Sequence, residues 1–219
     1  IVPTLSIAVM TELLTLPISI PLGVLAAWKA NTWVDRGILI LSTLGFSIPI
    51  FFLGFLLIKA FALEIPWFPA AGYVPPQEHF GNFLHRLILP SLCTAIIFWA
   101  FLVRMTRATM IEVLREDYIR TARAKGLAEG GVLIIHALKN AALPIATVVG
   151  WGIAELFAGI VVTEQVFAIP GMGRLIVDSI VRRDYPVIQG CMLTIAVLQV
   201  IVNLITDMSY ALFDPRIKY

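Results

Sequence analysis

The densest group of ionisable side chains in this sequence of 219 residues lies in residues 115–144. An arginine or lysine in the middle of a membrane costs on the order of 3 kcal/mol or more, so this block has to lie in water between the apolar segments that flank it. Side chains of these types can contact phospholipid head groups or bind another protein. The charged members are Arg115, Arg120, Arg123, Lys125 and Lys139, with Glu116, Asp117 and Glu129.

Residues 118–125 within this block predict a short helix, because alanine favours helix and Gly126 stands where a helix would stop. Ala122 and Gly126 are four residues apart, so they would share one face on which small side chains allow another backbone to come close. Arg120 and Arg123 would form a second, basic face. Such a helix suits insertion into a groove on another protein. From the residues alone, an ordinary loop held by phospholipid head groups explains the same pattern equally well.

Residues 132–143 continue the block in a different way. Most of these positions are apolar, while His136, Lys139 and Asn140 recur at the spacing of one helix face. This pattern predicts an amphipathic helix that lies along the membrane surface or re-enters it.

Four acids lie in or beside long apolar runs. Glu12, Glu155 and Asp207 fall inside such runs or near their ends, and Glu164 stands at the boundary of one. An acid within the membrane is by default a candidate for a functional site. The alternative is an acid near a helix end or one that pairs with another helix, which fits Asp207 best and stays open for Glu12 and Glu155. Glu164 is placed to help close an outer gate.

Several kinds of chemistry are excluded by missing motifs. The sequence has no Gly-x-x-x-x-Gly-Lys-[Ser/Thr], so the chain carries no P-loop for ATP. The Gly-Met-Gly tripeptide at 171–173 has no lysine after it and predicts a tight turn rather than a phosphate site. The patterns His-Glu-x-x-His and Gly-x-Ser-x-Gly are absent as well. His79, His85 and His136 are scattered over loops on two sides and cannot form one metal site, so we expect no metal site.

The apolar residues around the charged block make up most of the chain. Hydrophobic residues account for 59% of the sequence and charged residues for 14%, whereas soluble domains usually carry roughly 25% charged residues. The mean hydropathy is +0.92. These values indicate an all-α polytopic membrane protein. Its five expected spanning segments are residues 4–28, 37–61, 87–103, 143–162 and 187–211.

Polar connections and prolines define the loops between these segments. Ser47-Ile48-Pro49 predicts a kink in the second segment, and four prolines in residues 64–86 exclude a long helix there. We therefore expect one membrane domain over residues 1–219, with outer loops at about 64–86 and 164–186 and an inner loop at about 108–142. Of the 16 lysines and arginines, eleven fall on the side of the inner loop and five on the other. This bias predicts that the inner loop and the C-terminus are cytoplasmic.

Two segments of the charged block resemble a known protein family. Residues 117–127 read Asp-Tyr-Ile-Arg-Thr-Ala-Arg-Ala-Lys-Gly-Leu, and residues 136–144 read His-Ala-Leu-Lys-Asn-Ala-Ala-Leu-Pro. They resemble the EAA loop in permease subunits of bacterial ATP-binding-cassette (ABC) importers, in the branch for dipeptides, oligopeptides, glutathione and nickel. Other segments resemble the same branch in the same order, so the resemblance covers nearly the whole chain. These segments are Ser47-Ile48-Pro49 with Phe51, Trp67-Phe68-Pro69 with Gly72-Tyr73, Glu164 with Val166-Phe167, Pro170-Gly171-Met172-Gly173-Arg174, Arg183-Asp184-Tyr185-Pro186 and Asp214-Pro215-Arg216.

Two features depart from the general permease pattern. Arg120 stands where the namesake glutamate of the loop would be, and the spacing from Gly126 to Leu143-Pro144 is longer. Both features resemble those of the peptide branch, so they favour this branch within the permease family. The branch usually also has one more N-terminal membrane helix followed by an external loop, so we expect an additional helix to precede Ile1.

The resemblance implies a type I ABC importer permease fold in the bacterial cytoplasmic (inner) membrane and a set of partners. A second homologous permease subunit would complete the pathway, and two ABC ATPase subunits would bind ATP and Mg, which leaves no cofactor in this chain. An extracytoplasmic solute-binding protein would deliver a di- or oligopeptide or a peptide-like solute. ATP-driven closure of the ATPases would move the coupling helices and switch the pathway. The resemblance implies neither an enzymatic role nor nucleic-acid binding for this chain.

The depth and charge of the acids in the apolar segments suggest one group of site residues, and the resemblance implies the other. Glu12, Glu155 and Glu164 are the candidates for the translocation path or gate, where an acid would attract the cationic amino terminus of a peptide, and Glu164 would be able to contact the binding protein. The rival hypothesis is a secondary transporter that uses Glu12 and Glu155 as proton or ion sites and needs no ATPase. The residues implied to dock on the ATPase are Tyr118, Arg120, Thr121, Ala122, Arg123, Ala124, Lys125, Gly126 and Leu127.

Overall fold

The computed structural model describes residues 1–213, with side chains as far as residue 208. All regular elements in this range are helices. The tail at residues 214–219, which we expected in the cytoplasm, lies outside the described residues. In chain order the elements are α1 (Val2–Trp28), α2 (Trp33–Ser47), α3 (Ile50–Ile58), the π-helix η1 (Lys59–Glu64), α4 (Phe80–Leu114), α5 (Asp117–Ala124), α6 (Glu129–Gly131), the π-helix η2 (Val132–Leu138), α7 (Lys139–Val166), α8 (Met172–Arg182) and α9 (Tyr185–Phe213).

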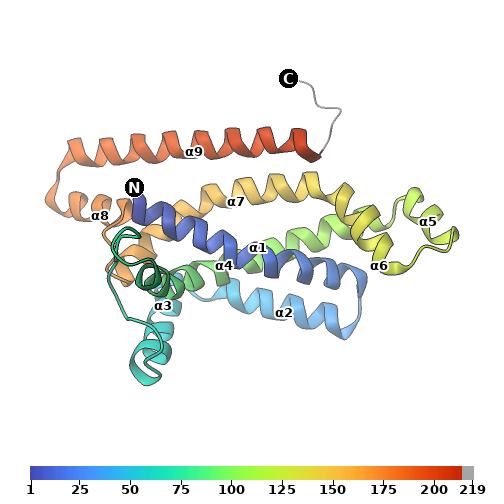
Figure 1. Cartoon of the computed structure of the whole chain (residues 1–219), viewed down its shortest axis with the longest axis horizontal. Helices are drawn as coiled ribbons and strands as arrows, with labels where there is room; N and C mark the ends of the chain where they lie inside the picture. The colour runs from blue at the N-terminus through green and yellow to red at the C-terminus, as the bar shows by residue number, and fades with distance from the viewer. Residues whose placement is uncertain (214–219) are drawn as a thin grey trace.

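The long helices lie side by side along the longest axis of the molecule (Figure 1). Helix α4 packs against α1, α2 and α7, and α9 packs against the other side of α7. Helices α5 and α6 lie at one end of this bundle, together with the α1–α2 connection, whereas α8 and Ile1 lie at the opposite end (Figure 1). We call the end with α5 the inner end and the end with α8 the outer end.

The number of spanning segments agrees with the five that we predicted. Four helical stretches are long and apolar enough to cross a membrane by themselves, namely Val2–Trp28, Phe80–Leu114, Glu129–Val166 and Tyr185–Met208. A fifth span arises if the bent pair Trp33–Ser47 and Ile50–Glu64 counts as one.

The second span is broken where the sequence predicted a kink, and the bend between its two halves is 96°. Ile48 has an extended backbone (φ −85°, ψ 125°), as is usual for the residue before a proline, and Pro49 has no N–H to donate to the preceding turn. By contrast, Pro17, Pro21, Pro90 and Pro144 lie inside continuous helices. Membrane helices tolerate such prolines because neighbouring groups satisfy the freed backbone oxygens.

Helices extend into two of the loops that we expected. Helix α4 runs from Phe80 to Leu114, so it takes residues from both the expected outer loop and the expected inner loop. Residues 132–143 do not form a separate surface helix, because η2 continues directly into α7 as one stretch, Glu129–Val166. The reason is that Val132, Leu133 and Ala137 are buried against α4 and α5, which holds this segment upright in the bundle.

The outer end is held by a contact between α7 and the start of α8. Glu164 is fully buried, and its carboxylate accepts hydrogen bonds from the Thr4 hydroxyl at 2.6 Å and the Arg174 backbone N–H at 3.0 Å. The Thr4 hydroxyl oxygen in turn accepts the Met172 N–H at 2.9 Å. The Gly-Met-Gly tripeptide is therefore a turn into a helix, as predicted, and the anion at that helix N-terminus is the chain's own carboxylate.

Both glycines of this tripeptide are required by close approach. A Cβ on Gly171 would overlap the carboxylate of Glu164, and a Cβ on Gly173 would lie 2.5 Å from the Cα of Val161. A backbone atom cannot move aside as a flexible side chain can, so α8 can lie this close to α7 only with glycine at 173.

We predict that Gly173→Ala destabilises the protein by about 1–3 kcal/mol, because the added methyl group overpacks the α7–α8 contact. The measurement is thermal unfolding of the purified protein in detergent, followed by tryptophan fluorescence. Gly190→Ala is the matched control, since nothing lies within 4 Å of a Cβ at that position in α9. We expect this control to melt at the wild-type temperature or slightly above it. Equal melting temperatures for the two variants would contradict the close contact.

Candidate functional site

Helix α5 projects from the inner end of the bundle as a separate short helix. It covers Asp117–Ala124, within one residue of the predicted helix at either end. Asp117 lies in its first turn, where an acid complements the helix dipole. Gly126 adopts φ +76°, the left-handed conformation that ends helices, and the N–H of Leu127 reaches back to the carbonyl of Ala122. The predicted helix and its stop signal are both confirmed.

One face of α5 packs on the chain itself. Ile119 has no exposed surface and Ala122 is 7% exposed, and both belong to an apolar cluster with Met110 of α4 and Val132 of η2. Our expectation that Ala122 and Gly126 form one exposed docking face was therefore wrong for Ala122. The small side chain of Ala122 allows α5 to lie close to α4 and η2, so the face that carries Ala122 points into the bundle.

The opposite face of α5 is open. Tyr118 and Leu127 are 41% and 45% exposed. Partial burial, with the negative charge of Glu116 beside it, raises the pKa of Tyr118 above its ordinary value, while an interaction with the Asn140 side chain works in the opposite direction. The exposed residues among those implied to dock are Tyr118, Arg120, Thr121, Arg123, Ala124, Lys125, Gly126 and Leu127.

The arginines of α5 are held by acids of the same segment. Arg123 donates from Nε to Glu129 at 2.9 Å and from a terminal nitrogen at 3.4 Å, which ties α5 to α6. Arg120 lies 3.3 Å from Asp117 in an exposed pair. Surface pairs of this kind contribute little to stability. Their effect is to orient the two guanidinium groups on the exposed side of the loop.

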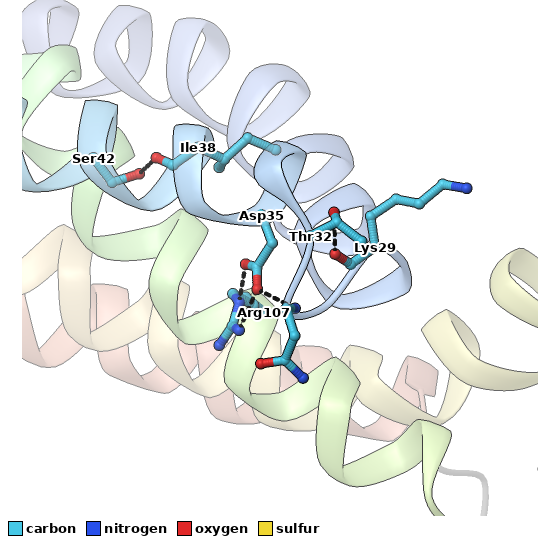
Figure 2. A network of polar contacts seen from close by, with 7 residues as sticks. Lys29, Thr32, Asp35, Ile38, Ser42 and Arg107 are labelled. Atoms are coloured by element: carbon cyan, nitrogen blue, oxygen red, sulfur yellow. Dashed lines mark hydrogen bonds and ion pairs between the residues drawn. The ribbon is translucent and has the colours of Figure 1, made fainter.

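A buried ion pair fixes the inner end of the bundle (Figure 2). Arg107 of α4 donates to both carboxylate oxygens of Asp35 at 2.5 and 2.7 Å, and the Asp35 side chain is only 3% exposed. The backbone N–H of Asn31 donates to the same carboxylate at 2.8 Å. This pair joins the first turn of α2 to α4, seven residues before α4 ends and ten before α5 begins. Sequence reasoning missed it, and the only available signals were an acid in a short polar break and an arginine late in an apolar run.

The structure does not bring the three candidate acids together. Glu155 is exposed and lines a cavity between α2, α3, α4 and α7. Glu12 lines a different pocket, on the α1 and α9 side of α7, where neither carboxylate oxygen has a hydrogen-bond partner within the described part of the chain. Glu164 is buried in the outer contact. With no exposed surface, it is out of reach of a binding protein or a transported solute in this conformation.

Long apolar helices, a polar helix held at the inner end and a cavity lined by one glutamate together define a polytopic helical membrane protein. The comparison with known families agrees. Residues 19–219 match the family of binding-protein-dependent transport system inner membrane components, and the chain belongs to this family. Its partner classes are therefore a solute-binding protein and an ATPase, and the chain is a non-catalytic membrane component.

The chain is also similar to individual proteins and to a solved structure. The chain is 45% identical to the oligopeptide transport system permease protein AppB of Bacillus subtilis, over 99% of this chain and 69% of that protein. It is 42% identical to the di/tripeptide transport system permease protein DppB of Pseudomonas aeruginosa, over 90% of this chain and 65% of that protein. Among solved structures, an inward-facing conformation of the MetNI methionine ABC transporter shares the fold, with a TM-score of 0.80, 16% identity, and coverage of 97% of this chain and 93% of that chain.

These comparisons confirm the resemblance that we drew from the sequence and the type I ABC importer permease fold. They also decide against the secondary-transporter hypothesis, because the chain is 45% identical, over 99% of its length, to a probable peptide ABC transporter permease protein of Sinorhizobium fredii, and ABC transporters are driven by ATP.

We predict that Arg107→Ala destabilises the protein by about 3–5 kcal/mol, because it leaves the buried carboxylate of Asp35 without its charge partner. Asp35→Ala should cost less, since Arg107 is 21% exposed and can reach water. A double-mutant cycle on unfolding in detergent should give a coupling energy of about 1–3 kcal/mol.

The control for this cycle is Arg174→Ala, because Arg174 pairs with Asp178 at 3.9 Å on an exposed surface. We expect that variant to stay within about 0.5 kcal/mol of the wild type. Strict additivity of Arg107→Ala and Asp35→Ala would show that the two side chains do not stabilise each other.

Proposed function

We propose that this chain is a permease subunit of an ATP-driven importer that moves di- or oligopeptides, or a peptide-like solute, into the cytoplasm. The family supplies the dependence on a binding protein, and the similarity to AppB and DppB supports peptides as the solute class, since those proteins are named as oligopeptide and di/tripeptide permeases. A second homologous permease would form the other half of the pathway. Two ATPase subunits would hold ATP and Mg.

The single observation that carries the docking part of this proposal is the construction of α5. The helix is anchored through Ile119 and Ala122 while its other face remains exposed. An anchored helix with an open face can transmit force to the bundle, whereas an unanchored loop would only bend. The exposed docking residues are Tyr118, Arg120, Thr121, Arg123, Ala124, Lys125, Gly126 and Leu127, and Ala122 serves as part of the anchor.

Transport would then follow from a two-state switch. ATP-driven closure of the ATPases favours the conformation in which the two α5 helices are close together, and ATP hydrolysis removes that preference. Because α5 is packed on α4 and on the start of α7, the shift of α5 moves these helices as rigid bodies and opens the pathway to the other side.

The orientation in the membrane belongs to the same proposal. The excess of lysine and arginine on the side of α5 supports a cytoplasmic inner end in a bacterial inner membrane, with the C-terminus on that side. The ATPase, which works in the cytoplasm, would then meet α5 directly.

Two alanines of α5 provide a matched test of docking. Ala124 is exposed, so Ala124→Trp should leave the melting temperature of the permease unchanged and lower its affinity for the ATPase at least ten-fold through bulk on the docking face. Ala122 is buried, so Ala122→Trp should lower the melting temperature by overpacking the anchor. The measurements are co-purification and titration of the ATPase subunits, together with thermal unfolding.

Wild-type ATPase affinity in Ala124→Trp would contradict the docking face. Gly126→Trp is a poorer test than either variant, because Gly126 has φ +76° and any side chain there strains the backbone whatever it does to docking.

A further inference from the structure

A cavity of about 320 Å³ opens between the α2–α3 break, α4 and α7. We call it the Glu155 pocket and define it by Phe46, Ile50, Phe101, Trp151 and Glu155. Among the side chains that the structure describes, Glu155 is the one ionisable group that lines it. All its other lining residues are apolar or aromatic except Thr94, whose hydroxyl is already shared with Thr163 and the carbonyl of Pro90.

Glu155 lies deep in the membrane-spanning part of α7. It is 16 residues from the inner end of this helix and 11 from the outer end, or about 24 Å and 16 Å at 1.5 Å per residue. Among residues 1–208, whose side chains the structure describes, none pairs with it. A carboxylate at this depth is costly unless it faces a watered cavity or finds a cationic partner, and the Glu155 pocket gives it an open side.

The wall beside Glu155 is aromatic. Trp151 precedes Glu155 by four residues on α7, so both side chains lie on the same face. The Trp151 ring lies 5.4 Å from that of Phe101, which stacks on Phe98 at 6.4 Å. Aromatic faces attract ammonium groups. The ring of Phe46 already carries the guanidinium of Arg104 at 5.1 Å, so Phe98, Phe101 and Trp151 are the lining rings that remain for a ligand.

A second, independent feature points to the same cavity. Phe46 and Ile50 flank the 96° break between α2 and α3, and both line the pocket. Non-helical backbone at membrane depth is tolerated where it lines a cavity, and broken spans mark the ligand sites of transporters because they free polar backbone groups. The break between α2 and α3 therefore borders the same cavity as the Glu155 carboxylate.

We infer that the Glu155 pocket binds the positively charged amino terminus of the transported peptide during its passage through the membrane. Glu155 neutralises the ammonium group, and Trp151 and Phe101 cover it. This inference rests on the proposed function and adds to it a recognition site within the permease itself, separate from the binding protein. It requires a negative charge at position 155, and a side chain of equal size without the charge does not replace it.

The test uses the intact transporter, purified with its partner subunits and reconstituted in liposomes. The probes are trialanine, which has a free amino terminus, and N-acetyl-trialanine, which lacks that charge. Import of trialanine is measured at saturating binding protein, and binding of both probes is measured on the same transporter without binding protein. The variants are Glu155→Gln, Glu155→Asp and the control Asp178→Asn, an acid on the outer helix α8 that lies outside the pocket.

We expect Glu155→Gln to lower trialanine import and trialanine binding at least ten-fold, with unchanged ATPase association and unchanged binding of N-acetyl-trialanine. Glu155→Asp should retain most of the import, and Asp178→Asn should behave as the wild type. Wild-type import by Glu155→Gln would overturn the inference and leave the proposed function intact. Equal loss of both probes, or equal loss in Glu155→Asp, would also overturn it. A wild-type transporter that imports no peptide would overturn the proposed function instead.

Discussion

The cost of an unpaired charge in hydrocarbon constrains every ionisable side chain of this protein. The long helices satisfy their own backbone groups, so the apolar bundle needs no polar side chains to exist. Apolar packing is not directional, however, and does not by itself fix how far one helix slides along another. Asp35 with Arg107 at the inner end, and Glu164 with Thr4 at the outer end, provide directional contacts that set this register. Each of these groups is tolerated because its partner is supplied by the same chain.

Helix α4 connects these features mechanically. Along one continuous helix it carries Phe101 in the Glu155 pocket, Arg107 in the buried ion pair and Met110 in the cluster beneath α5. Phe101 and Met110 are nine residues apart, or about 14 Å. A rigid element that contacts both the pocket and the docking helix is a physical basis for coupling between them, which sequence position alone would not provide. The ion pair strengthens this basis because it ties α4 to the first turn of α2 and limits bending at the inner end.

Features that depend on nearby residues in the sequence could be predicted. Features that depend on contacts between distant parts of the chain could not. The apolar segments, the stop at Gly126 and the break at Pro49 follow from hydropathy and backbone restrictions, and all were found. The inward face of Ala122 did not follow, because spacing shows which residues share a face but not what that face meets. The ion pair between Asp35 and Arg107 joins residues 72 positions apart, and no local pattern indicates it. Residues 132–143 are helical as expected, with a π-helical first part, but their pattern does not show that they extend α7 and pack on α4 and α5.

The three glutamates show why an intramembrane acid has to be interpreted through its surroundings. Glu164 already accepts hydrogen bonds from Thr4 and Arg174, so a ligand would have to displace bonds that hold the outer end together, at roughly 1–3 kcal/mol for each group left unpaired. Glu12 is enclosed by apolar side chains, and its oxygens are out of reach of a passing solute. Glu155 can gain and lose a partner without breaking any contact of the fold, because its open side is a cavity. Reversible binding during transport requires this property. Of the two acids without a partner in the described residues, Glu12 has buried oxygens and Glu155 is exposed, so Glu155 is the one with this property.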